Sequence, residues 1–247
     1  ITCRDWSSDV CSSDLSLTPE PARTRHSGIK RYYPVLQWLP APDQLGECFN
    51  ALTHLVAVSR DTALLAVLQQ HLSAMGIQLT QISTEGKYLL PTSPDDEYIK
   101  NLLKEIAEVD GPVDGFICLA CDDEPERDAR AESILFLFAK HMQRVIRPSQ
   151  HGGRQCFIAC TSLDGNLGVG GEVKLHARNG SVFGLLKSLQ QEWPQFFCRA
   201  IDFAPALSTE QRIISLLAEL QDPQKGLVEV GIDQAGRWTI QWQEEMT

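Results

Sequence analysis

The 247-residue sequence has no run of about 18 apolar residues, so it offers no candidate for a membrane-spanning helix. It also lacks the charged, apolar and small-residue regions of a secretory signal. Basic residues are fewer than acidic ones, 22 against 32, and such a balance does not favour a nucleic-acid footprint. We therefore expect a cytoplasmic protein without membrane or nucleic-acid partners.

Glycine is missing where a nucleotide-binding fold needs it most. The apolar residues 54–58 predict a buried strand, and the turn after it reads Ser59, Arg60, Asp61, Thr62. Glycines at such a turn let the backbone approach a pyrophosphate, and the carboxylate of Asp61 would repel one. The turn therefore predicts no standard dinucleotide site.

Residues 5–15, DWSSDVCSSDL, do not read as natural protein. Their codons can be written as DNA that resembles a common sequencing-adapter primer, so we interpret the segment as an assembly artefact. The alternative is a disordered tail rich in serine and aspartate. The segment holds three aspartates and no basic residue, so leaving it out changes the net charge from −10 to −7. The natural N-terminus is then unknown.

The rest of the chain, 43% hydrophobic over its full length, alternates apolar runs with amphipathic stretches. Its order predicts a Rossmann-like, doubly wound, mostly parallel α/β sheet without the Gly-rich dinucleotide turn. The apolar stripes of the predicted helices 61–75 and 95–109 include Met75 and Val109, so both side chains are expected to be buried. Predicted strands are 31–39 (an edge strand because of Pro34), 54–58, 77–82, 113–120, 155–160, 196–203, 227–232 and 237–242; predicted helices are 61–75, 95–109, 129–146, 180–193 and 208–220; predicted loops include 83–94 and 121–128.

The stretch 180–205 organises this pattern. An apolar stripe at i, i+3, i+4 and i+7 predicts one helix face, formed by Val182, Leu185, Leu186 and Leu189. Polar residues off the stripe are expected to face water, namely Lys187, Gln190, Gln191 and Glu192. Pro194 cannot continue the helix, and residues 196–203 then predict a strand buried on both faces.

This stretch resembles the ketoreductase region of polyketide synthases and polyunsaturated fatty acid synthases. The pattern G-L-x-K-x-L-x-x-E-W-P followed by C-R-A-x-D-x-A-P is typical of the first half of that region. The matching positions here are Gly184, Leu185, Lys187, Leu189, Glu192, Trp193 and Pro194, then Cys198, Arg199, Ala200, Asp202, Ala204 and Pro205. The match is specific over more than twenty residues, and a looser one extends from about residue 31 to residue 242.

Reductases of the resembled short-chain class use a serine, a tyrosine and a lysine. Alignment on the helix puts Ser162 at the serine position, but Leu175 at the tyrosine position and Asn179 at the lysine position. Leucine cannot donate a proton, and asparagine carries no charge that would lower a phenol's pKa. These three residues therefore form a pseudo-site without predicted catalysis. A strand-end cap is the simpler role for Ser162, and His176 is the only nearby candidate acid.

Two other groups of residues could bind ligands. A glycine cluster lies within 164–171 and could cradle a phosphate, although a flexible loop is the simpler interpretation. Four cysteines lie on, or directly after, two successive predicted strands: Cys118, Cys121, Cys156 and Cys160. Their spacing sends Cys118 and Cys121 to opposite strand faces while Cys156 and Cys160 share one face, so no zinc site is predicted.

The resemblance implies a function for the chain as a whole. In the resembled synthases the first half of the ketoreductase is structural, and the second half carries the NADPH site and the catalytic residues. We expect residues 1–15 to be artefact, 16–29 a linker, and 30–247 the structural half, inactive alone, without cofactor or metal. Its expected partners are the catalytic half and the acyl carrier protein of the same synthase. Strands bearing Trp38, Trp238 and Trp242 are expected to meet the catalytic half.

Two alternatives remain open from the sequence. One is a free-standing, divergent short-chain reductase, which would need an acid such as His176 beside Ser162. The other is a ligand-binding pseudoenzyme that uses the loop 164–171. The product of the parent synthase and the oligomeric state cannot be inferred from these residues.

Overall fold

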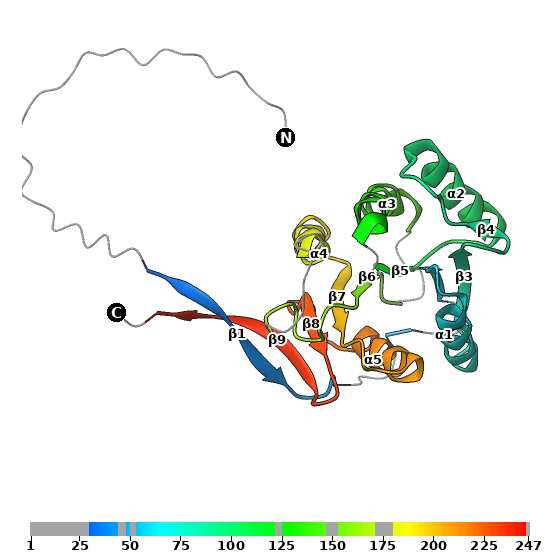
Figure 1. Ribbon diagram of the computed structural model, residues 1–247. Helices are drawn as coiled ribbons and strands as arrows, with labels where there is room; N and C mark the ends of the chain where they lie inside the picture. The colour runs from blue at the N-terminus through cyan, green and yellow to red at the C-terminus, as the bar shows by residue number, and fades with distance from the viewer. Residues whose placement is uncertain are drawn as a thin grey trace, which may run out of the picture.

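The computed structural model describes residues 30–43, 48–49, 53–121, 125–146, 153–170 and 180–245 (Figure 1). The predicted artefact and linker, residues 1–29, lie outside the described residues. Over the described residues the chain forms a nine-stranded sheet with helices on both faces, so the predicted fold class is confirmed. No helix within the described ranges is both long and apolar enough to cross a membrane.

Strands and helices alternate through most of the chain. The strands are β1 Tyr32–Leu39, β2 His54–Val58, β3 Gln78–Ser83, β4 Tyr88–Leu89, β5 Gly115–Cys121, β6 Cys156–Thr161, β7 Phe197–Phe203, β8 Glu229–Ile232 and β9 Arg237–Glu244. The helices are α1 Thr62–Ala74, α2 Asp96–Val109, α3 Pro125–Val145, α4 Gly180–Glu192 and α5 Thr209–Leu220.

The spatial order of the strands is β1-β9-β8-β7-β6-β5-β2-β3-β4. Pairing is parallel from β4 through to β8, while β9 runs antiparallel to β8 and β1 runs antiparallel to β9. The chain leaves β2 toward β3 on one side and returns to β5 on the other. In sheets of this kind, ligands bind at the carboxyl ends of the strands where the order reverses, which here means β2 and β5.

Each face of the sheet has its own apolar core. One core packs the strands against α2, α3 and α4, and the other packs them against α1 and α5 (Figure 1). Consecutive side chains of a strand point to opposite faces, so β7 contributes Cys198 and Ala200 to the first core and Phe197 and Ile201 to the second. Strands buried on both faces explain the continuous apolar runs in the sequence.

Helix α4 ends as its sequence predicts, one residue before Trp193 and two before Pro194. Trp193 is buried and packs its ring against Phe157 and Phe196, with centroids 6.0 and 5.1 Å apart. The expectation for Gln190 was wrong. Its amide is partly buried and bridges to the next strand, because it donates to the Phe196 carbonyl and accepts from the Cys198 N–H.

The structure corrects three other predictions. The predicted loop 83–94 contains the short strand β4, which pairs with β3. The predicted acidic loop 121–128 overlaps α3, which begins at Pro125, a residue whose fixed φ suits the first position of a helix. Met75 and Val109 are 42% and 62% exposed because both lie where a helix ends and the chain leaves the packed layer.

Candidate functional site

The turn after β2 is closed by its own side chains. Ser59 is fully buried, and its Oγ accepts the Asp61 N–H at 3.0 Å. Asp61 is the N-cap of α1, and its Oδ1 accepts the Leu64 N–H at 3.0 Å. A helix N-terminus attracts anions, and here the anion is a carboxylate of the chain itself. The turn does not fit the pyrophosphate of a dinucleotide.

The glycine loop after β6 is closed in a similar way by Asp202, which projects from β7. Its carboxylate accepts the backbone N–H groups of Leu163, Gly165 and Leu167 at 2.7, 2.9 and 3.0 Å, and the Thr161 hydroxyl at 3.1 Å. These are the donors that a phosphate would need. The loop therefore wraps around an internal carboxylate.

Asp164 accepts three further N–H groups of this loop. Its carboxylate accepts the N–H groups of Asn166, Gly168 and Gly170 at 2.8, 2.9 and 3.1 Å. The pKa of Asp202 is raised to about 6, mainly by burial and also by Asp164, although the Leu163 and Leu167 amides act to lower it. The two aspartates leave little capacity for an external anion.

The glycines of the loop have a steric role. Gly165 adopts φ 75°, and a Cβ there would lie 2.5 Å from the Ile232 carbonyl oxygen and 2.8 Å from the Ala204 nitrogen. Only glycine allows the loop to pass so closely over the ends of β7 and β8. The glycine cluster thus reflects packing of backbone on backbone.

Ser162 is the one residue of the predicted pseudo-site that lies within the described ranges. It is 4% exposed, and its Oγ has no hydrogen-bond partner among the described residues. The side chain lines a cavity of about 10 Å³ between α1 and α5, which has room for about one water molecule. Leu175, Asn179 and the candidate acid His176 lie outside the described residues, so their placement stays a prediction.

Three of the four cysteines have described side chains, which do not converge, while the side chain of Cys121 lies outside the description. Cys118 packs in the core under α3, whereas Cys156 and Cys160 pack in the core under α1 and α5. Burial raises the pKa of Cys156 to about 12, so its thiol stays protonated. Within the described ranges, no group of three or more histidine, cysteine, aspartate or glutamate residues could hold a metal ion.

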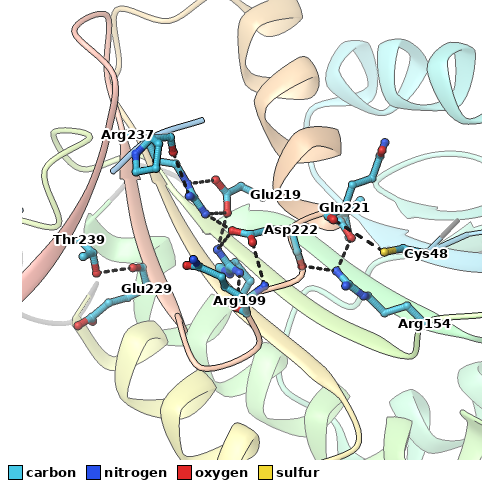
Figure 2. A network of polar contacts seen from close by, with 12 residues as sticks. Cys48, Arg154, Arg199, Glu219, Gln221, Asp222, Glu229, Arg237 and Thr239 are labelled. Carbon is cyan, nitrogen blue, oxygen red and sulfur yellow. Dashed lines mark hydrogen bonds and ion pairs between the residues drawn. The ribbon is translucent and has the colours of Figure 1, made fainter. Parts of the chain in front are cut away.

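Sequence reasoning missed a buried ionic cluster at the other end of β7 (Figure 2). Arg199, fully buried, contacts Glu219 of α5 at 2.5 Å and Asp222 at 3.3 Å. Arg237 of β9 contacts the same two carboxylates, with Nε 2.5 Å from Glu219 Oε1. We call these four residues the clamp. In the sequence, the only feature that indicated the clamp was one arginine, Arg199, within the apolar run 196–203.

The chain matches no family model, but its sequence is similar to part of a known synthase. Over 166 residues it is 28% identical to one of the subunits of a polyunsaturated fatty acid synthase from Thraustochytrium sp.. The match covers 64% of this chain and 6% of that protein, so the relative is far longer than the chain.

Solved structures share the fold. An A-type ketoreductase from a modular polyketide synthase matches with a TM-score of 0.59 at 16% identity, over 87% of this chain and 42% of that one. A ketoreductase from the macrolactin assembly line matches with a TM-score of 0.61 at 11% identity, over 88% and 45%. A variant of a Serratia marcescens short-chain dehydrogenase/reductase matches with a TM-score of 0.55 at 12% identity, over 74% and 97%. The predicted resemblance to ketoreductases of such synthases is confirmed.

Proposed function

We propose that this chain is the non-catalytic, structural half of a β-ketoacyl reductase domain in a multidomain polyketide or fatty acid synthase. The observation that carries the proposal is the occupation of both expected anion sites by internal carboxylates. Asp61 caps α1, while Asp164 and Asp202 fill the loop after β6. The fold of a nucleotide-binding reductase is retained, but these residues do not fit NADPH.

The coverage of the similar structures supports the same proposal. The chain spans less than half of the polyketide synthase ketoreductase chains that it matches, so more than half of each is additional protein. In the proposed arrangement that additional part is a catalytic half, which binds NADPH and reduces the ketone. The acyl carrier protein of the same synthase would deliver the substrate to that half.

The proposed mechanical role is to cover apolar surface on the catalytic half and so fix its active-site loops. A surface suited to such packing lies between α3 and α4, where an open hollow of about 510 Å³ is lined by Phe136, Leu137, Val182 and Leu185. Phe136 is 56% exposed at this hollow, and apolar side chains that gather at a hollow mark an interaction site.

The test compares the chain alone with the chain plus the catalytic half encoded by the reading frame of the parent synthase. Titration of the chain alone with NADPH, followed by cofactor fluorescence, should show no saturable binding, and a β-ketoacyl thioester should not be reduced. Adding the chain to the separate catalytic half should raise turnover. Saturable NADPH binding by the chain alone, or no effect on the catalytic half, would contradict the proposal.

A free-standing short-chain reductase is the second candidate. The match that covers 97% of the Serratia marcescens enzyme favours it, because the chain contains nearly the whole of such a fold. This candidate requires turnover by the chain alone, and Ser162→Ala should then abolish it. A third candidate, a pseudoenzyme that binds a ligand in the loop 164–171, would have to displace Asp164 or Asp202 from the loop amides.

A further inference from the structure

Strands β1 and β9 form a two-stranded arm that extends from one end of the sheet (Figure 1). The two strands pair with each other over eight residue pairs. By contrast, β9 pairs with β8 at only two positions, Gly231 with Trp238 and Ile232 with Arg237. Beyond Trp238, each strand of the arm therefore has only the other as a partner in the sheet.

The tryptophans of the arm lie on one of its faces. Residues directly opposite each other in an antiparallel pair point to the same face. Trp38 lies opposite Trp238, Leu36 opposite Ile240, and Pro34 opposite Trp242. We call this set, together with Tyr32, the tryptophan face: Tyr32, Pro34, Leu36, Trp38, Trp238, Ile240 and Trp242.

The tryptophan face is largely open to solvent. Trp38 is 58% exposed, Trp242 is 62% exposed and Tyr32 is 51% exposed. A two-stranded ribbon is marginally stable without a third layer, and a clustered exposed apolar surface marks an interaction site. The opposite face carries Gln37 and Gln241, and no tryptophan.

The charged side chains near the free end of the arm pair with one another. Lys30 lies 3.1 Å from Glu244, and Arg31 lies 4.0 Å from Glu245. Glu244 lies opposite Tyr32 and so shares the free end of the tryptophan face, whereas the other six residues of the face are all apolar: Pro34, Leu36, Trp38, Trp238, Ile240 and Trp242. The chemistry of the face suits an apolar partner surface of the kind found in permanent interfaces.

The clamp and a neighbouring hydrogen bond fix the base of the arm. Arg237 binds Glu219 and Asp222 on the α5 side of the sheet and donates to the carbonyl of Pro40, just beyond β1 (Figure 2). The next residue, Trp238, donates its indole N–H to Asp233 at 3.0 Å. The tryptophan face is thereby turned toward the α4 side, where Ile240 meets the core under α3 and α4.

We propose that the tryptophan face is the docking surface for the catalytic half, with Arg237 as the positioning residue that sets the direction of the arm. This inference rests on the proposed function. In that function the catalytic half follows this half in the synthase, and β9, the last strand described, ends at Glu244, so the partner is joined on the side of the arm's free end. Such a connection gives a high effective concentration, which favours contact with the nearest apolar surface.

The test replaces exposed tryptophans and measures binding of the separately produced catalytic half by calorimetry. The double variant Trp38→Ser with Trp242→Ser should raise the dissociation constant at least about 30-fold, since buried tryptophan anchors commonly carry such effects. A matched control, Gln37→Ser with Gln241→Ser, changes the opposite face and should alter it less than about threefold. Arg237→Lys should give an intermediate loss.

A second measurement separates docking from folding. Acrylamide quenching of tryptophan fluorescence should fall when the catalytic half is added to the unaltered chain, and far-ultraviolet circular dichroism should confirm that the variants fold. Tight binding by the double tryptophan variant would overturn the inference, as would sedimentation showing a dimer of the chain that those tryptophans mediate. If the unaltered chain has no effect on the catalytic half, the proposed function fails instead.

Discussion

Strand β7 buries one charge near each of its ends, and the two sites are neutralised differently. Arg199 lies among the carboxylates of Glu219 and Asp222, with Arg237 completing the clamp. Asp202, three residues later, lies among backbone amides and one hydroxyl. The first site pairs full charges of opposite sign, whereas the second relies on dipoles.

The difference appears in how each site responds to protons. Two guanidinium groups and two carboxylates leave the clamp with no net charge, although burial lowers the pKa of Arg199. At the second site Asp202 and Asp164 are both acidic, and burial raises the pKa of Asp202 to about 6. The clamp is therefore a permanent connection between β7, α5 and β9, while the loop after β6 is the part that titrates.

The largest expected effect follows from breaking the clamp. Arg199→Met leaves two buried carboxylates with Arg237 alone, so the free energy of unfolding should fall by about 3–5 kcal/mol. Urea denaturation followed by circular dichroism measures the change. As a control, Lys187→Met breaks the Lys187–Glu229 pair, 2.7 Å apart with the lysine 47% exposed, and should cost about 1 kcal/mol or less. Equal losses of unfolding free energy in the two variants would contradict the distinction between the buried clamp and an exposed ion pair.

The second effect is the pH dependence contributed by Asp202. Its pKa in the folded state, about 6, is raised above the ordinary value of 3.8, so folding favours the protonated form. The resulting stabilisation is complete below pH 3.8 and is lost as the pH rises through 6. Between pH 7 and pH 4 the unaltered chain should gain about 2–3 kcal/mol relative to Asp202→Asn. If the free energies of unfolding of the two proteins change in parallel between pH 7 and pH 4, Asp202 does not titrate in that range.

Local signals in the sequence were sufficient for most elements. The stripe of Val182, Leu186 and Leu189 fixes the buried face of α4. Ser208 and Gln211 form a capping box at the start of α5, which lies within the predicted helix 208–220. These features depend on residues within one or two helical turns, so the sequence alone could predict them.

The partners of buried polar groups could not be predicted in the same way. Asp202 accepts hydrogen bonds from a loop 35 to 39 residues earlier, and the clamp joins Arg199 to residues 20 and 23 positions later. Such pairs depend on the register of neighbouring strands, which no local pattern specifies. The arm shows the same limit, because both strands were predicted but their pairing across about 200 residues was not.

The smallest expected effect comes from an exposed carboxylate that accepts a backbone N–H, as the buried carboxylate of Asp202 does. Asp61 is exposed, and Asp61→Ala removes its bond to the Leu64 N–H, so the free energy of unfolding should fall by only about 1 kcal/mol. Asp95→Ala removes the equivalent N-cap of α2, bonded to the Tyr98 N–H at 2.9 Å, and should cost about the same. Thermal unfolding of both variants measures the two effects. Because water can replace an exposed carboxylate, a loss as large as that of Arg199→Met would mean that the turn after β2 is a third buried site. Asp61→Ala should also gain no NADPH binding, since the turn would still lack glycine.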